Sequence, residues 1–281
     1  MNFKFDLQRK HIKNIPVHIV LVIWALLSVF PLIWMMASSL KEQHEVFNNT
    51  SLLPQAWKFV NYVKAWEVGS FGIYFFNSVF YTAVTLVLVL FLASMAAFVF
   101  ARYRFMGRNL LYLLFIGSLM IPIPGAFIPL YVLLIKLGLA DTRLGLILPY
   151  TNAGLALAIF ILKTFFENVP KEIEEAAIID GCNKFDMYWR IFLPLAKPAM
   201  ATVAIFTVLN VWNEFILALI VITNRNLMPI QRGIMVFQGE HLTNYPLLMA
   251  GLTIATIPLL IIYFFLSKYI LKGITAGAVK G

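Results

Sequence analysis

The sequence predicts an all-α membrane protein with six transmembrane helices, and three observations support this fold class. Hydrophobic residues make up 61% of the 281 residues and charged residues only 12%, whereas soluble globular chains carry about 25% charged residues. Six apolar stretches are long enough to cross a bilayer, which takes about 20 residues. Lys and Arg gather in alternate loops between these stretches, as expected when positive charge is retained on the cytoplasmic side.

The six predicted spans are Val17–Ala37, Phe76–Ala101, Leu110–Ile135, Leu144–Phe166, Ala199–Ile222 and Leu247–Ile270. The first span follows a basic N-terminal segment, as the apolar core of a secretory signal peptide would. Its apolar run is longer than the about 7–15 residues of such a core, and no small-residue cleavage site follows it. We therefore interpret it as a retained span.

The distribution of basic residues predicts the orientation of the chain. Of the 22 Lys and Arg residues, 15 fall on the side of the membrane that holds both termini and 7 on the other side. Both termini are therefore predicted in the cytoplasm. This gives a cytoplasmic segment 1–16, a transmembrane domain 17–270 and a cytoplasmic tail 271–281. The formal net charge is +9, and the basic residues lie between the apolar runs. This position favours contact with anionic lipid headgroups over binding of nucleic acid.

Two regions outside the regular spans carry further signals. The third span contains Pro122, Pro124 and Pro129, and because proline removes a backbone donor we expect this helix to be kinked or interrupted. The outer segment Ser38–Phe75 is rich in Trp and Tyr, which favour the headgroup level. It is interpreted either as an interfacial helix or as a docking surface for an extracytoplasmic partner.

The loop between the fourth and fifth spans, residues 167–198, predicts a pair of short helices. Asn168 is a candidate N-cap of the first helix, and Gly181 supplies a left-handed stop at its end. Asn183 is a candidate N-cap of the second helix, which Pro194 is expected to close.

One face of the first loop helix is small and apolar. Ile173, Ala176 and Ala177 fall on this face, at helical spacing. Two adjacent alanines make a low surface that a cleft in another protein could approach closely. Acidic residues in its first turns interact favourably with the positive, N-terminal end of the helix dipole.

The loop resembles the EAA loop of permeases in binding-protein-dependent ABC importers. The resemblance rests on Glu175-Ala176-Ala177, Asp180-Gly181 and Ile191-Phe192-Leu193-Pro194, with the family's spacing between Gly181 and Pro194. It implies a type I ABC importer permease fold, in which the first loop helix is a coupling helix seated in a cleft of the ATPase subunit. The residues that the resemblance assigns to ATPase coupling are Glu172, Glu175, Ala176, Ala177, Asp180, Gly181, Ile191, Leu193 and Pro194.

The resemblance extends over nearly the whole chain and points to the carbohydrate branch, above all to the second permease subunit of maltose-type transporters. It is carried by Asn61-Tyr62, Phe76-Asn77-Ser78, the broken third span, Trp212-Asn213-Glu214 and the tail from Ile274 to Gly281. It implies a bacterial plasma-membrane location and import of a sugar or oligosaccharide. The implied partners are a second permease subunit, two ATPase subunits that hold ATP and Mg²⁺, and an extracytoplasmic solute-binding protein.

In that branch the C-terminal tail reaches between the ATPase subunits. The tail residues expected to make this contact are Thr275, Gly277 and Lys280. Without the resemblance, an ordinary frayed terminus would be the simpler interpretation.

Glu214 is the only acidic residue inside any predicted span. Asn210 lies one helical turn before it and Asn213 beside it, and Thr151 and Asn152 form a second polar pair in the fourth span. Because an ionisable group is costly at membrane depth, Glu214 should face the bundle interior or a wet cavity. Two interpretations stay open. These residues either line a path for a hydroxylated solute or act as polar contacts between helices or subunits.

Other function classes find little support in the sequence. The chain has no GxxxxGK[ST] run, so any ATP that drives it must bind to a partner. The four histidines show no metal-ligand spacing, and nothing resembles a catalytic constellation, so we expect neither an enzyme nor a cofactor on this chain. The alternatives are an ABC permease for a non-sugar solute and an ion-coupled secondary transporter. One intramembrane acid and no evident inverted repeat argue against the latter.

Overall fold

The computed structural model describes residues 15–48, 51–120, 123–238 and 243–278. These residues form helices, turns and loops, with an isolated β-bridge between Gln238 and Thr243. The predicted all-α fold class is therefore confirmed for the described chain. Two compact units are present: one is built from the chain up to Gly69 with Val236–Ile254, and the other from Ser70–Met235 with the chain from Ala255 onward.

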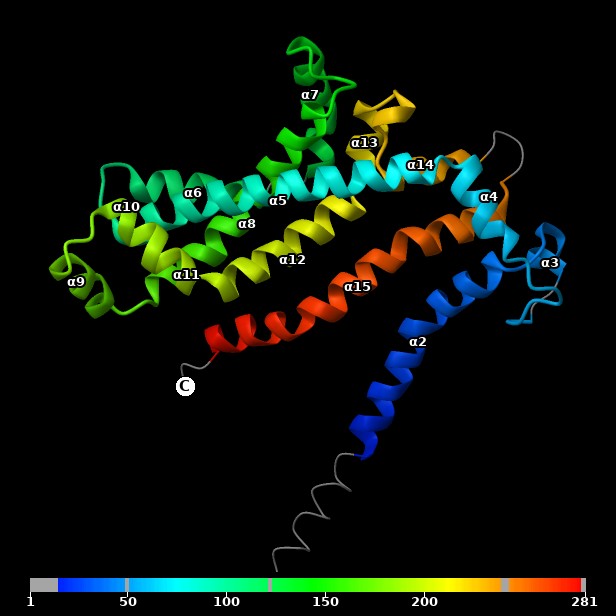
Figure 1. Ribbon diagram of the computed structural model, residues 1–281, viewed down its shortest axis with the longest axis horizontal. Helices are drawn as coiled ribbons and strands as arrows, with labels where there is room; N and C mark the ends of the chain where they lie inside the picture. Colours follow the sequence, from blue (N-terminus) through cyan, green and yellow to red (C-terminus); the bar gives the residue numbers. More distant parts are fainter. Residues whose placement is uncertain (1–14, 49–50, 121–122, 239–242, 279–281) are drawn as a thin grey trace, which may run out of the picture. The chain divides into compact units, whose positions relative to one another are not determined.

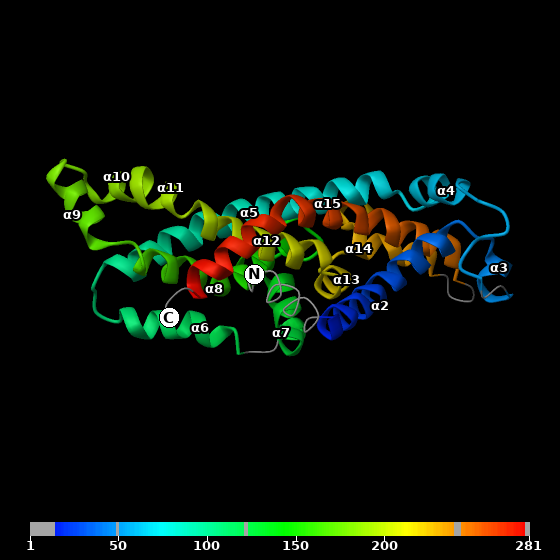
Figure 2. The ribbon, with the colours of Figure 1, turned by 90° about the horizontal axis from the view of Figure 1, so that it is seen from below.

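The larger unit is a bundle built around three long helices. Helices α5, α8 and α12 pack against one another along their lengths, as both ribbon views show (Figures 1 and 2). The elements from Ser70 to Met235 are α5 (Phe71–Arg102), α6 (Arg108–Ser118), α7 (Ile123–Lys136), α8 (Leu144–Glu167), α9 (Lys171–Ile179), α10 (Lys184–Asp186), the π-helical turn η1 (Met187–Phe192), α11 (Leu193–Leu195), α12 (Lys197–Asn213), α13 (Ile216–Val221), η2 (Arg225–Leu227) and α14 (Ile230–Gly233).

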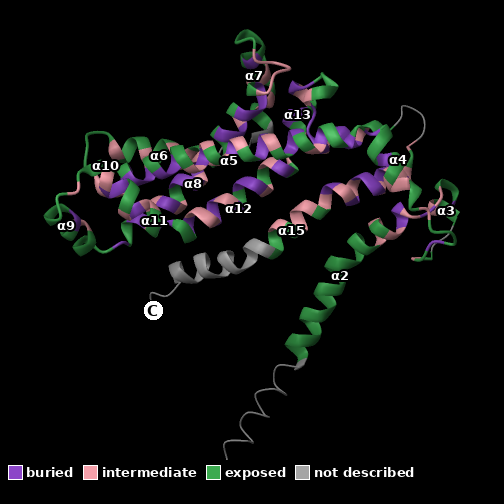
Figure 3. Ribbon diagram, viewed as in Figure 1, coloured by how far each residue is buried: buried purple, intermediate pink, exposed green. Residues whose placement is uncertain are grey.

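The smaller unit contains α2 (Ile15–Ser39), α3 (Gln43–Asn48), α4 (Val60–Val68) and the first turns of α15 (Tyr245–Ala278), which follows η3 (Ile234–Phe237). The Gln43 side chain joins its two chain segments, because its amide donates to the Thr243 carbonyl and accepts from the Tyr245 N–H. Most of α2 is exposed (Figure 3). Its apolar side chains suit a lipid or protein environment that the chain alone does not provide.

Four helices of the described chain are long and apolar enough to cross a membrane: α2, α5, α8 and α15. A fifth is added if the 184–195 and 197–213 helices, which meet at a bend of 72°, count as one span. The first, second, fourth and sixth predicted spans thus correspond to continuous helices. The total of six spans and the cytoplasmic position of the termini stay predictions.

The third and fifth predicted spans are interrupted. The third is divided between α6, which ends at Ser118, and α7, which begins at Ile123, so the expected interruption is confirmed, whereas Pro129 lies inside α7. The fifth was predicted as one continuous span, but α12 ends at Asn213 and α13 begins at Ile216. The cause is Glu214, whose backbone is extended (φ −69°, ψ 128°) and whose carboxylate accepts the N–H groups of Leu217 and Ala218. The first N–H groups of a helix have no carbonyl acceptor within the helix, and here the Glu214 carboxylate is the acceptor for two of them.

Loops at the predicted outer end of the bundle are held by polar side chains. Asp141 Oδ1 accepts the N–H groups of Thr223 and Asn224, each at 2.9 Å, and these hydrogen bonds, above all the one from Asn224, lower the pKa of the Asp141 carboxyl. The buried Asn77 amide donates to the carbonyl oxygens of Asn226 and Met228. The connection before α14 is therefore fixed to α5.

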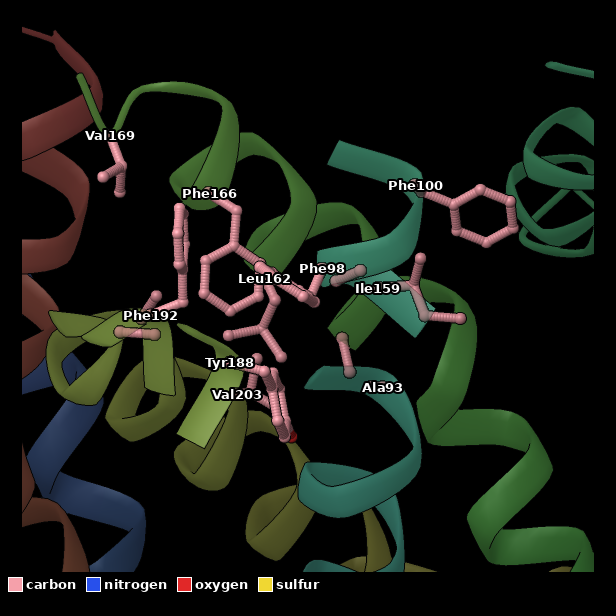
Figure 4. Close-up of a cluster of buried hydrophobic side chains, with 14 of the residues drawn as sticks. Ala93, Phe98, Phe100, Ile159, Leu162, Phe166, Val169, Tyr188, Phe192 and Val203 are labelled. Atoms are coloured by element: carbon pink, nitrogen blue, oxygen red, sulfur yellow. The ribbon is translucent and has the colours of Figure 1, made fainter. Parts of the chain in front are cut away.

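The predicted cytoplasmic end of the bundle has an aromatic core. Phe98 of α5, Phe166 of α8 and Phe192 of η1 lie with ring centroids 5.0–6.0 Å apart, and Figure 4 shows them gathered with Leu162 and Tyr188. Such a cluster of buried rings contributes both burial and favourable edge-to-face contacts. It fixes the loop after α8 to the body of the bundle.

Candidate functional site

The loop between α8 and α12 contains the helix pair that the sequence predicts. It lies at the end of α5 and α8 in both ribbon views (Figures 1 and 2). Gly181 has a φ of 78°, the left-handed conformation that ends α9. Asn183 Oδ1 accepts the N–H groups of Phe185 and Asp186, each at 2.9 Å. The predicted roles of Gly181 and Asn183 are therefore confirmed.

Two other local predictions in this loop are wrong. Asn168 does not cap α9: its backbone is still helical (φ −84°, ψ −9°), it terminates α8, and its amide donates back to the Thr164 carbonyl. Pro194 does not close the second helix, which continues to Leu195. The π-helical turn at 187–192 precedes the proline. Its wider turn relieves the clash between the pyrrolidine ring and the preceding turn.

One face of α9 is buried by the chain itself. Ala177 is only 3% exposed and belongs to the core cluster with Phe166, Met187 and Phe192. Its carbonyl also accepts the N–H of Cys182 at 2.9 Å. Of the two adjacent alanines expected to meet the ATPase, Ala177 thus seats α9 on the bundle, whereas Ala176 is exposed.

The other face of α9 is open and more apolar than the sequence analysis anticipated. Ile178 is 59% and Ile179 85% exposed, and Phe185 and Trp189 nearby in the chain are also exposed. We call Ile178 and Ile179 the exposed isoleucine pair. None of these four residues is among the predicted site residues, although two adjacent isoleucines at the end of a short helix are a usable signal in the sequence.

The remaining predicted coupling residues are distributed along the loop. Those with exposed side chains or backbone are Glu172, Glu175, Asp180, Gly181 and Pro194, whereas Ile191 and Leu193 are partly buried. The exposed members of this set on α9 and at its end are accessible to a partner, as are Ala176 and the exposed isoleucine pair. Their role in binding an ATPase stays a prediction.

Arg102, the last residue of α5, connects several elements beneath α9. Its Nη2 donates to the carbonyl oxygens of Phe166 and Val169, at 2.7 and 2.5 Å. Its Nη1 donates to Glu174 Oε2 of α9 at 3.3 Å, and the guanidinium carbon lies 4.7 Å from the centre of the Phe192 ring. Neither Arg102 nor Glu174 is predictable as a partner of the other from the sequence, because the two are 72 positions apart in the chain.

Glu214 is engaged within the protein. Tyr150 Oη of α8 donates to Glu214 Oε2 at 2.7 Å, and the same carboxylate accepts the N–H groups of Leu217 and Ala218. This geometry favours the interpretation of Glu214 as a polar contact between helices over that of a solute ligand. In the sequence Asn210 lies one helical turn before Glu214, but in the structure the helix ends between them, at Asn213.

The other residues of the predicted solute path do not take part in the hydrogen bonds of Glu214. Asn210 and Asn213 are exposed on α12, and the Asn213 amide donates to the Leu209 carbonyl. Asn210 borders a small pocket between α8 and α12, of about 20 Å³, next to Gly154. Thr151 is buried and donates to its own helix, whereas Asn152 is exposed. The structure thus leaves three exposed asparagines as candidates.

We expect Glu214→Ala to lower the stability of the protein by about 1–3 kcal/mol, because three donors lose their acceptor. Tyr150→Phe removes one of the three donors and should cost less, about 1 kcal/mol. The midpoints of thermal unfolding in detergent measure both effects. A solute ligand would behave differently: Glu214→Ala would then keep the wild-type midpoint and change only the affinity for the solute.

The tail residues are described in part. Thr275 and Gly277 lie within α15, which continues to Ala278, and Lys280 lies outside the described residues. The described chain contains no group of three His, Cys, Asp or Glu side chains that could hold a metal ion.

Comparisons with known proteins match the sequence over most of its length. The model of a family described as "Binding-protein-dependent transport system inner membrane component" matches residues 90–276. The chain is 37% identical to the Probable ABC transporter permease protein YurM of Bacillus subtilis, over 96% of this chain and 90% of YurM. It is 34% identical to the Diacetylchitobiose uptake system permease protein NgcG of Streptomyces coelicolor, over 94% and 88%. It is 33% identical to the Trehalose/maltose transport system permease protein MalG of Thermococcus litoralis, over 96% and 98%.

The fold is also similar to that of a solved structure. A chain in the crystal structure of a bacterial ABC transporter involved in the import of the acidic polysaccharide alginate matches with a TM-score of 0.82, at 24% identity. The match covers 93% of this chain and 97% of the other. It confirms the expected permease fold of an ABC importer.

Proposed function

Because the chain belongs to the family of inner membrane components of binding-protein-dependent transport systems, we propose that it is one of two permease subunits of an importer for sugars or oligosaccharides. It is a multi-pass protein of the bacterial plasma membrane. The names of two relatives, which refer to diacetylchitobiose and to trehalose and maltose, support the choice of substrate class.

The observation that carries the proposal is the exposed isoleucine pair on α9. Apolar side chains so exposed are expected to be covered by a partner. They lie in a loop whose Lys and Arg content predicts the cytoplasmic side, on the side where an ATPase would bind. An ATPase subunit docked on α9 would bury both side chains.

The proposed mechanism divides the work between subunits. ATP and Mg²⁺ bind to the ATPase pair, and closure of this pair moves α9 and with it the ends of α5 and α8. The bundle then alternates between outward-facing and inward-facing states, and a binding protein delivers the solute on the outer side. This chain forms part of the path and performs no chemical step itself.

The test is reconstitution of the complete transporter. The second permease, the ATPase and the solute-binding protein are co-expressed with this chain, and ATP hydrolysis is measured in proteoliposomes with and without candidate sugars. We expect a sugar-loaded binding protein to stimulate hydrolysis and to drive uptake. Stimulation by amino acids but not by sugars would contradict the substrate class, and failure of any ATPase to co-purify would contradict the proposed docking of an ATPase on this chain.

A further inference from the structure

Arg102 is a buried cation at the C-terminal end of α5. Its side chain is only 6% exposed, and its Nε has no hydrogen-bond partner in the described chain. Burying a guanidinium carries a desolvation cost that its pairings only partly offset. Such a residue therefore adds less to the stability of the fold than its contacts suggest. Its contacts connect separate elements of the bundle.

The contacts of Arg102 join the end of α5 to three other parts of the loop region. The Phe166 carbonyl lies in the last turn of α8, where it also accepts the Val169 N–H, and the Val169 carbonyl lies between α8 and α9. Glu174 belongs to α9 itself, and Phe192 to η1. The planar guanidinium donates to both carbonyls and to Glu174 while it lies against the Phe192 ring. The ammonium group of a lysine does not have this planar, forked geometry.

The seating of α9 on the bundle involves two attachments of different kinds. Its C-terminal half is attached through the buried Ala177 in the aromatic cluster. Its N-terminal half is attached through Glu174, whose side chain is 25% exposed, against 6% for Arg102. At 3.3 Å the contact with Glu174 is the longest of the three Arg102 hydrogen bonds. Any tilt of α9 pulls on this ion pair and, through Arg102, on the end of α5.

We propose that Arg102 is a positioning residue that transmits movement of α9 to α5 and α8, with Glu174 as its contact on α9. This inference rests on the proposed function, in which an ATPase moves α9. In this inference, ATP hydrolysis is coupled to transport partly through Arg102, a side chain that lies outside the loop carrying the family resemblance. The ATPase subunit does not need to touch Arg102 for this role.

The test uses the complete transporter in proteoliposomes and measures solute taken up per ATP hydrolysed. Arg102→Gln removes the cation, and Glu174→Ala removes only the contact on α9 while Arg102 keeps its two carbonyl partners. We expect both variants to retain the ATPase subunits and to transport about tenfold less solute per ATP. Arg102→Lys should recover part of the loss, since it keeps the charge but not the geometry.

The matched control is Arg108→Gln. Arg108 forms an ion pair with Glu167 of α8 at 3.7 Å, so this variant removes an arginine–glutamate pair in the same region without affecting α9. We expect it to keep the wild-type ratio of uptake to hydrolysis. A merely structural role for Arg102 would lower the amount of assembled transporter and leave this ratio unchanged.

The outcomes separate this inference from the proposed function. If wild-type transporter shows no sugar-stimulated hydrolysis, the proposed function fails. If the wild type is stimulated and Glu174→Ala keeps the wild-type uptake per ATP, the role of Arg102 in transmission is overturned. Should Arg102→Gln fail to assemble, Glu174→Ala decides, because its substitution leaves the buried arginine paired.

Discussion

Replacing Ile178 and Ile179 together with glutamine is expected to release the ATPase subunits from the permease while the permease stays folded. Both side chains are exposed in the chain alone, so their loss should not affect its own packing. Burial of an isoleucine side chain contributes about 1.5–3 kcal/mol. Glutamine is a good helix former and should preserve α9.

The loss of two such side chains corresponds to about 3 kcal/mol, and hence to more than about a hundredfold weaker association. The measurement is the amount of ATPase that co-purifies with the permease, with the permease melting temperature as a check on folding. Leu53→Gln is the matched control, because Leu53 is similarly exposed but lies on the predicted outer side. Full retention of the ATPase by the double variant would show that docking does not use the exposed isoleucine pair.

We expect Gly145→Ala to destabilise the bundle by about 1–3 kcal/mol. A Cβ at position 145 would lie 2.3 Å from the Leu139 carbonyl oxygen, a backbone atom that cannot turn away. The same turn is fixed by Thr142, whose hydroxyl donates to Leu139 and accepts from the Gly145 N–H. Relief of the clash therefore requires the start of α8 to shift.

Gly117→Ala in α6 is the control for this substitution. A Cβ there has no heavy atom within 4 Å among the described residues, and alanine favours a helix over glycine by about 1 kcal/mol. We expect Gly117→Ala to leave the thermal midpoint unchanged or slightly higher and Gly145→Ala to lower it. Equal midpoints for the two variants would contradict the steric argument.

Predictions from the sequence succeeded where the physical cause is local. Gly181 and Asn183 act through their own backbone and the next three residues, so a single segment contains all the information. The interruption of the third span, directly before Pro124, is also a local effect. The break at Glu214 is not predictable from hydropathy, because hydropathy is averaged over a window of residues. In addition, the Glu214 carboxylate accepts the N–H groups of Leu217 and Ala218 only in the broken conformation, in which α13 starts anew after Glu214.

Errors arose where two local rules competed. Asn168 can cap the helix that follows it or end the helix that precedes it, and the structure selects the second role. Pro194 ends a regular α-helix, but a wider turn before it allows the helix to continue. The Arg102–Glu174 pair could not be predicted from either segment, since the packing of α5 beneath α9 brings the two together.

The π-helical turn at Met187–Phe192 has a consequence for how this loop can vary. A wide turn accommodates one more residue than an α-helical turn, and each residue rotates the following side chains by about 100°. Loss of one residue there would restore a regular helix but turn Phe192 away from Phe98 and Phe166. The loop should therefore accept exchanges of its exposed side chains more readily than any change in its length, so that the number of residues between Gly181 and Pro194 is itself a constrained property of the sequence.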